Sequence, residues 1–156
     1  INRIFPESKI ILAMRHPMDV CLSNFMQNYK LNDAMANFAT LEGTAIMYKA
    51  VMDLWLLYTE ALNINSHTVK YENLVESLEL ETRKLFAFLS VPWDENVLSY
   101  YKHAGKRKTI KTPSYQDISK PIFTRARYRW KRYEKYLEPV KELLIPYVEH
   151  FEYDLK

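Results

Sequence analysis

A strand, an arginine, a proline and a serine follow one another near the start of the chain, in an order suited to anion binding. The apolar run 10–14 is typical of a buried strand, and Arg15 follows it directly. Pro17 opens a helix that carries Ser23, eight residues after the arginine. Arginine offers a planar fork of donors, and a helix N-terminus offers N–H groups and a positive dipole end. The pattern predicts a phosphate site at the carboxyl edge of a sheet.

The same residues also have a simpler interpretation. Arg15 at a strand end is compatible with a structural salt bridge, and Ser23 is compatible with a solvent-facing helix position. His16 is a candidate base, but a histidine beside a strand end more often packs or caps a helix. This segment alone leaves both interpretations open.

A second strand at residues 67–71 ends in Tyr71 and leads into another helix. An aromatic residue at the carboxyl end of a strand is well placed to line the crevice where α/β sheets bind ligands. Tyr71 is therefore a candidate for stacking on, or hydrogen bonding to, a purine. The alternative is a core tyrosine whose hydroxyl reaches solvent.

Positive charge is concentrated near the C-terminal third of the chain. The net charge is +3, but residues 102–135 carry +10 and the remainder carries −7. Hydroxyl and cationic side chains on this segment suit a clamp on a phosphate held from the other side. Arginine interleaved with Trp and Tyr also suits nucleic acid, and a solvated basic face is the plain alternative. The candidate clamp residues are Ser114, Lys120, Arg125 and Arg127.

Composition excludes several classes of site. The 156 residues are 48% apolar, which is enough for one globular domain, and no apolar run approaches the length of a membrane span. One cysteine excludes an intramolecular disulfide and suits a reducing compartment, and four scattered histidines with no Cys/His cluster argue against a structural zinc. We therefore expect a cytoplasmic protein without a metal. Only Gly43 and Gly105 occur, so neither a glycine-rich phosphate loop nor a dinucleotide fingerprint is present.

The order of predicted elements indicates an α/β fold with a parallel sheet. Strands are predicted at 9–14 and 67–71. Helices are predicted at 17–29, 40–62, 72–89, 94–104 and 130–151, the last interrupted near Pro139 and Pro146, with a loop or short helix at 31–38 and a loop at 105–128. In helix 40–62, Met47, Trp55 and Tyr58 suit either a substrate pocket or, more simply, a core stripe.

Four segments together resemble the PAPS-dependent sulfotransferases. Residues 15–23 (RHPMDVCLS) resemble the segment that binds the 3′-phosphate, and residues 69–74 (VKYENL) resemble a strand that ends in a Y-E-[DN]-L motif. Residues 114–122 and 129–134 (RWKRYE) resemble the end of bacterial sulfotransferases, which are often attached to tetratricopeptide repeats, and more distantly of tyrosylprotein sulfotransferases. The resemblance spans about residues 9–137 in the family's order.

This resemblance implies a P-loop-like α/β fold and transfer of a sulfuryl group from PAPS to an acceptor hydroxyl or amine, with PAP as product. It implies that Arg15 and Ser23 bind the 3′-phosphate and that Tyr71 lies near the adenine. Ser114 and Lys120 would complete the phosphate clamp, and Arg125 and Arg127 would join it. The implied partners are the nucleotide and an unidentified small-molecule, glycan or protein acceptor, with neither membrane nor nucleic acid expected.

The chain also departs from the family pattern. Tyr128 stands where a glycine is usual. The family's 5′-phosphosulfate loop and its catalytic base precede the segment that corresponds to residue 9, and neither is found here. We therefore expect residues 1–156 to be a single, N-terminally truncated domain that is at most a weak nucleotide binder, with 102–135 as its nucleotide-clamping region. A basic module for nucleic acid or another polyanion is the alternative, and a P-loop kinase fragment is a third.

Overall fold

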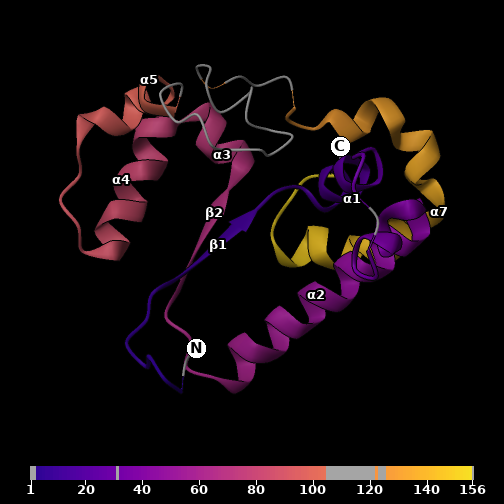
Figure 1. Cartoon of the computed structure of the whole chain (residues 1–156), viewed down its shortest axis with the longest axis horizontal. Helices are drawn as coiled ribbons and strands as arrows, with labels where there is room; N and C mark the ends of the chain where they lie inside the picture. The colour runs from indigo at the N-terminus through magenta and orange to yellow at the C-terminus, as the bar shows by residue number, and fades with distance from the viewer. Residues whose placement is uncertain (1–2, 31, 105–121, 123–125, 156) are drawn as a thin grey trace. The chain divides into compact units, whose positions relative to one another are not determined.

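The structure is a computed structural model that describes residues 3–30, 32–104, 122 and 126–155 (Figure 1). The chain divides into two compact units, which are described separately. The helical unit comprises Ile1–Ser8, Arg15–Asn65 and Arg127–Lys156, and the sheet unit comprises Lys9–Met14 and Ser66–Ala126. The loop predicted at 105–128 lies largely outside the described residues.

The sheet unit is built on two parallel strands, β1 (Ile10–Met14) and β2 (Ser66–Lys70). Their register runs from Ile10 opposite Ser66 to Met14 opposite Lys70, and Figure 1 shows the strands side by side. Both predicted strands and their parallel pairing are therefore confirmed. In the described part of the chain the sheet has two strands, so a complete P-loop-like sheet stays a prediction.

The helices of the sheet unit are more broken than their periodicity predicted. The single helix expected at 72–89 is two helices, because Ser77 adopts non-helical angles (φ −141°, ψ 62°) between them. Asp94 caps the next element as predicted, since its carboxylate accepts from Asn96 N at 2.8 Å, but that element is a 3₁₀ helix. The elements are α3 (Tyr71–Glu76), α4 (Leu78–Leu89), η2 (Glu95–Ser99) and α5 (Tyr100–Ala104).

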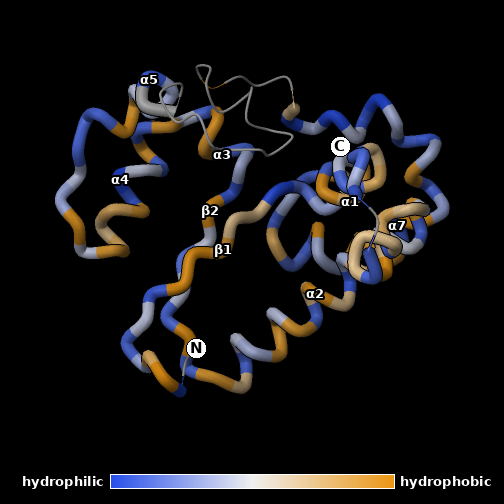
Figure 2. Tube along the Cα trace, viewed as in Figure 1, coloured by the Kyte–Doolittle hydropathy of each residue, from blue (hydrophilic) through white to orange (hydrophobic). Residues whose placement is uncertain are grey.

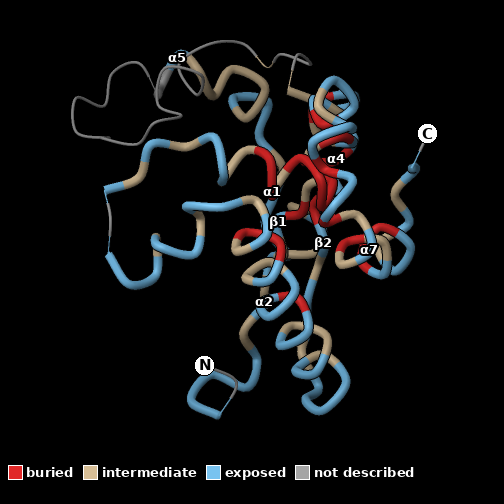
Figure 3. Tube along the Cα trace, turned by 90° about the vertical axis from the view of Figure 1, so that its right-hand side faces the viewer, coloured by how far each residue is buried: buried red, intermediate tan, exposed pale blue. Residues whose placement is uncertain are grey.

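The helical unit holds the main described core, contributed by three α-helices and one 3₁₀ helix. Its buried members are Met18, Cys21, Leu22, Ala45, Trp130, Leu137, Val140 and Leu144. Figure 3 shows that α1 is largely buried. The elements are α1 (Pro17–Phe25), η1 (Met35–Ala39), α2 (Leu41–Ala61), η3 (Arg129–Tyr133) and α7 (Glu134–His150).

Two helices of this unit differ from the sequence prediction. The first helix ends at Phe25 rather than near residue 29, because Tyr29 folds back and donates its hydroxyl to Asn24 Oδ1 at 2.6 Å. The last helix continues through Pro139 and Pro146, which were expected to interrupt it. Both prolines are exposed, so water can reach the carbonyls whose partner N–H groups are missing, while the opposite face stays packed in the core.

Helix α2 begins and ends where its pattern predicted. Thr40 caps it, and Thr40 Oγ1 accepts from Gly43 N at 3.0 Å. The predicted core stripe is only partly buried: Ala45 and Met52 are buried, whereas Tyr58 is 47% exposed. Apolar positions recur along the whole helix (Figure 2), and several of them are exposed: Ile46, Val51, Leu54 and Leu57. No described helix is long and apolar enough to cross a membrane.

Gly43→Ala is expected to destabilise the helical unit, although alanine is ordinarily the better helix residue by about 1 kcal/mol. A Cβ at this position would lie 2.6 Å from the backbone oxygen of Asn37 in η1, so backbone has to move. We expect a net loss of about 1–3 kcal/mol in the free energy of unfolding, measured in urea. Ala50→Gly, at an exposed position of the same helix, is the control for propensity alone. A gain in stability for Gly43→Ala would contradict the close approach of η1.

Candidate functional site

Arg15 stands between the end of β1 and the start of α1. Its Nη2 lies 3.4 Å from Asp19 Oδ2, four residues further on, and the Arg15 side chain is 23% exposed. The Asp19 side chain is fully buried. The structural salt bridge that the sequence left open therefore exists, but the guanidinium still reaches the surface. A guanidinium carries five N–H donors in a planar fork, which is the geometry that binds phosphate oxygens.

The start of α1 does not provide the row of donors that the sequence predicted. Pro17 has no N–H, and Met18 N donates to His16 Nδ1 at 3.2 Å. His16 is the N-cap and is completely buried. Because the cap itself uses an N–H group at this helix end, Arg15 is the stronger candidate anion ligand of the segment.

His16 is a structural residue rather than a base. Its ring stacks on Trp130 at 4.9 Å between centroids, and its Nε2 lies 3.1 Å from the carbonyl oxygen of Asp154. Since Nδ1 accepts from Met18 N, we assign the proton to Nε2, which donates to Asp154. Both nitrogens have structural partners, so the catalytic alternative loses support.

Ser23 lies on α1, one turn after Asp19 on the same side of the helix. It is half-buried, and its hydroxyl has no hydrogen-bond partner among the described residues. A side-chain hydroxyl both donates and accepts, so Ser23 can bind a phosphate oxygen. The helix thus brings the predicted Ser23 into line with the residue that holds Arg15.

The RWKRYE segment joins α1 through Trp130. Trp130 N donates to Asp19 Oδ1 at 2.8 Å, across 111 residues of sequence, and the indole is 2% exposed. The first and last of the four family-like segments therefore meet in the core of one unit. Neither Asp19 nor Trp130 is among the site residues that the sequence predicts. The buried contacts of these two residues connect the segments.

Tyr128 has a left-handed backbone, with φ 51° and ψ 33°. Glycine favours this conformation, which accounts for the glycine usual at this position in the resembling family. The tyrosine is tolerated here while its ring lies edge-on to His16 at 5.9 Å. The cations of the neighbouring Arg127 and of Lys131 lie 5.2 and 5.0 Å from the centre of the same ring. The backbone follows the glycine pattern although the residue does not.

The structure describes only one of the four predicted clamp residues. Arg127 is half-buried and lies three residues before Trp130, so the Asp19–Trp130 bond ties its segment to α1. The other three, Ser114, Lys120 and Arg125, lie outside the described residues. Their part in a clamp stays a prediction.

Tyr71 is the first residue of α3 and directly follows β2. It is half-buried. The residues that precede Arg15 and Tyr71, Met14 and Lys70, are opposite one another in the strand register. Arg15 and Tyr71 belong to different units, so the described geometry does not join their side chains in one site.

Residues 1–95 match a protein-family model described as the sulfotransferase family. The match covers more than half of the chain and includes the strand, Arg15, the first helix and Tyr71. The chain belongs to the sulfotransferase family.

A relative of this sulfotransferase chain is an uncharacterized protein of Aquifex aeolicus (strain VF5). The two are 34% identical over 146 residues, which is 90% of this chain and 18% of that protein. The chain therefore spans about a fifth of the length of its relative. The resemblance to sulfotransferases is confirmed at the level of the family.

A small apolar cavity of about 180 Å³ lies inside the helical unit of this sulfotransferase chain. Its lining comes from α1, η1 and α2, namely Val20, Asn24, Phe38, Thr44, Met47, Tyr48 and Val51. Met47, a candidate for a substrate pocket, is among them. The other two candidates on α2, Trp55 and Tyr58, do not line it. Tyr48 also packs against the core cluster, which favours the simpler core interpretation for this helix.

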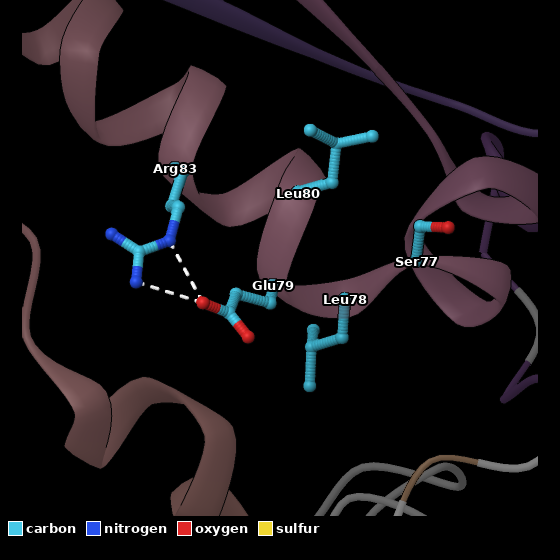
Figure 4. A pocket seen from close by; sticks show the side chains of 5 residues that line it. All are labelled: Ser77, Leu78, Glu79, Leu80 and Arg83. Atoms are coloured by element: carbon cyan, nitrogen blue, oxygen red, sulfur yellow. Dashed lines mark hydrogen bonds and ion pairs between the residues drawn. The ribbon is translucent and has the colours of Figure 1, made fainter.

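The sheet unit has a hollow of about 460 Å³ at the start of α4, lined by Ser77, Leu78, Glu79, Leu80 and Arg83. Figure 4 shows Arg83 and Glu79 directed toward one another, and Arg83 Nε and Nη2 both donate to Glu79 Oε1, at 2.9 and 2.7 Å. In this hollow the charges of Arg83 and Glu79 therefore neutralise each other. It contains none of the residues that the family resemblance assigns to the nucleotide.

Titratable groups elsewhere in the helical unit serve packing. Burial raises the pKa of the Cys21 thiol to about 12, so the one cysteine is an unreactive core residue. The Tyr147 hydroxyl donates to Asp53, which also pairs with Lys49 at 2.5 Å. Hydrogen bonds from Lys49 and then Tyr147 lower the pKa of Asp53, while burial and the bond to Asp53 raise that of Tyr147. These contacts join α2 to α7. Within the described residues, no three His, Cys, Asp or Glu side chains gather as metal ligands.

Proposed function

We propose that this chain supplies the 3′-phosphate-binding half of a PAPS site in a sulfotransferase that transfers a sulfuryl group to an acceptor hydroxyl or amine. The observation that carries the proposal is the pairing of Arg15 with the buried Asp19 at the head of α1, with Ser23 one helical turn after Asp19 on the same helix. Family membership supplies the reaction class. The nucleotide is the co-substrate, and PAP is the product.

The donor set fits a phosphate dianion. Arg15 contributes a partly exposed guanidinium, which forms charge-assisted bonds to phosphate oxygens. Ser23 contributes a hydroxyl without a partner in the described part of the chain. A 3′-phosphate is the group that distinguishes PAPS from nucleotides of the AMP and ATP type. The proposed ligand is therefore the 3′-phosphate rather than a 5′-phosphate.

The family resemblance extends the proposal to further residues. Tyr71, at the end of β2, is proposed to lie near the adenine. The proposed clamp that closes on the phosphate comes from the basic region 102–135, through Ser114, Lys120, Arg125 and Arg127. The role of Arg127 in this clamp is supported by the hydrogen bond between Trp130 and Asp19, which ties the segment of Arg127 to α1.

Sulfuryl transfer also needs groups that the proposal does not assign to residues 1–156. In-line transfer requires stabilisation of the developing negative charge and a base on the acceptor. His16 is occupied by structural contacts, and the sequence has no glycine-rich motif of the phosphate-cradling type. We therefore propose that these residues bind nucleotide weakly and do not catalyse transfer by themselves. The bacterial, repeat-associated type and a cytoplasmic location, which suits the single reduced cysteine, are parts of the same proposal.

Calorimetric titration tests the proposed site. We expect PAP to bind more tightly than AMP, because only PAP carries the 3′-phosphate. Arg15→Ala should weaken PAP binding by roughly ten- to a hundredfold, the value of about 1.5–3 kcal/mol for a hydrogen bond to a charged group. Binding of AMP should change little, so the preference should disappear.

Arg83→Ala is the matched control for that experiment. Arg83 also pairs with a carboxylate four residues away in sequence, Glu79, but it lies in α4. Its removal should leave PAP binding unchanged. Equal, salt-sensitive binding of PAP, AMP and any oligonucleotide would instead support the polyanion-binding alternative, which family membership does not favour.

A further inference from the structure

We propose that Asp19 is a positioning residue for recognition of the 3′-phosphate: one buried carboxylate sets both the guanidinium of Arg15 and the backbone that follows Arg127. The inference rests on the proposed function, because it takes Arg15 as the phosphate ligand. Asp19 itself is not a ligand, since its side chain is fully buried and carries the same sign of charge as the phosphate.

The two oxygens of Asp19 have different partners. Oδ1 accepts from Trp130 N at 2.8 Å, and Oδ2 lies 3.4 Å from Arg15 Nη2. The first partner belongs to η3, 111 residues after Asp19, and the second precedes α1, so the carboxylate joins two segments far apart in sequence. A single rigid group therefore fixes the distance between them.

The charge of Asp19 needs an explanation beyond the bond to Trp130. A neutral acceptor such as asparagine would satisfy that N–H group, whereas a buried carboxylate is costly unless it is paired. Arg15 supplies the pairing charge. The carboxylate is thus suited to holding a guanidinium, not merely to anchoring a backbone.

Holding the guanidinium favours binding at Arg15. An arginine side chain has many rotamers, and immobilising it on binding lowers affinity. The Arg15 side chain is only 23% exposed, and its Nη2 is already paired with Asp19. A ligand therefore meets an ordered fork. Because Arg127 precedes Trp130 by three residues, the same carboxylate also ties the start of that segment to α1.

Asp19→Asn separates the two contacts. Asparagine can still accept from Trp130 N through Oδ1, but its NH₂ group would face the guanidinium as donor to donor. We expect the unfolding transition to move little and the affinity for PAP to fall about three- to tenfold relative to AMP, as Arg15 loses its fixed position. Calorimetric titration with PAP and with AMP gives the ratio, and urea denaturation gives the stability of the same samples.

Glu81→Gln is the matched control. Glu81 is another buried carboxylate paired with a cation, Lys84, at 2.6 Å, but it lies on α4. Its neutralisation should leave the ratio of PAP to AMP affinity unchanged. If Asp19→Asn also leaves that ratio unchanged or raises it, while Arg15→Ala removes the preference, the inference about Asp19 is wrong and the proposed function stands. If Arg15→Ala itself leaves the preference for PAP over AMP unchanged, the proposed function is wrong, and the inference about Asp19 is wrong with it.

A measurement on the unmodified protein covers the case in which Asp19→Asn does not fold. Saturating PAP should slow hydrogen exchange of the Trp130 amide at least threefold, because a ligand on Arg15 stabilises the group that this amide binds. The Asn96 amide, which donates to Asp94 Oδ1 at the same 2.8 Å, is the internal control. Equal responses of the two amides to PAP would overturn the proposal.

Discussion

Trp130→Ala is expected to destabilise the helical unit by about 3–5 kcal/mol, the range for deletion of a buried tryptophan. The indole is 2% exposed and is the largest fully buried side chain of the described residues. It lies in the core cluster with residues of α1, α2 and α7, and it also stacks on His16. The cavity left by alanine would therefore open between three helices. Urea denaturation followed by circular dichroism measures the loss.

Trp130→Phe is the control that separates the contribution of an aromatic ring at this position from the contribution of the full side-chain volume. Phenylalanine keeps an aromatic face against His16, and the backbone bond to Asp19 does not depend on the side chain. The indole Nε1 is buried without a hydrogen-bond partner within the described ranges, so its removal also removes an unsatisfied donor. We expect Trp130→Phe to cost only about 1 kcal/mol. A cost equal to that of alanine would mean that Nε1 has a partner and that the core depends on it.

Local patterns were sufficient to predict the elements around the site. The strand before Arg15, the proline that opens α1 and the parallel second strand follow from residue types alone, and all three are confirmed. The N-cap Thr40 is likewise local. Such features depend on neighbours within about four residues, which the sequence displays directly.

Long-range contacts could not be predicted in the same way. The bond between Asp19 and Trp130 spans 111 residues, and the type of neither residue predicts its partner. An aspartate four residues after an arginine is visible in the sequence, but its burial is not, and on a helix surface that spacing also describes an ordinary ion pair. The signal present in the sequence is the co-occurrence of the two family-like segments, which indicates the family but not that the segments are in contact.

Corrections to the helices have tertiary causes. The sequence predicts interruptions at the prolines of α7 because each removes a helical hydrogen bond, yet burial of Leu137, Leu144 and their neighbours holds the helix through both. His16 was considered as a base because of its type and position. Its burial and its contacts with Trp130 and Asp154 make it structural instead. Helix propensity and residue type are therefore weak predictors of helix ends and residue roles at positions where tertiary packing determines the structure.

His16→Ala is the second substitution with a large expected effect, because one imidazole holds three segments. It caps α1 through Met18 N, stacks on Trp130 of η3, and binds Asp154 in the C-terminal segment through Nε2. The ring is completely buried. Losing the cap costs about 1 kcal/mol and losing the buried packing and hydrogen bond adds about 2 kcal/mol, so we expect about 3 kcal/mol in the free energy of unfolding.

His16→Asn divides that loss into its parts. Asparagine is a good N-cap and can accept from Met18 N, but it cannot stack on Trp130 or reach Asp154 in the same way. We expect it to recover about 1 kcal/mol relative to alanine in urea denaturation. Hydrogen exchange gives the local effect: both variants should speed exchange near Tyr153, whose N–H binds Val148 O at 2.8 Å, and only alanine should speed exchange at Met18. Unchanged exchange near Tyr153 in both would show that the C-terminal segment is held without His16, because the imidazole is its described link to the head of α1.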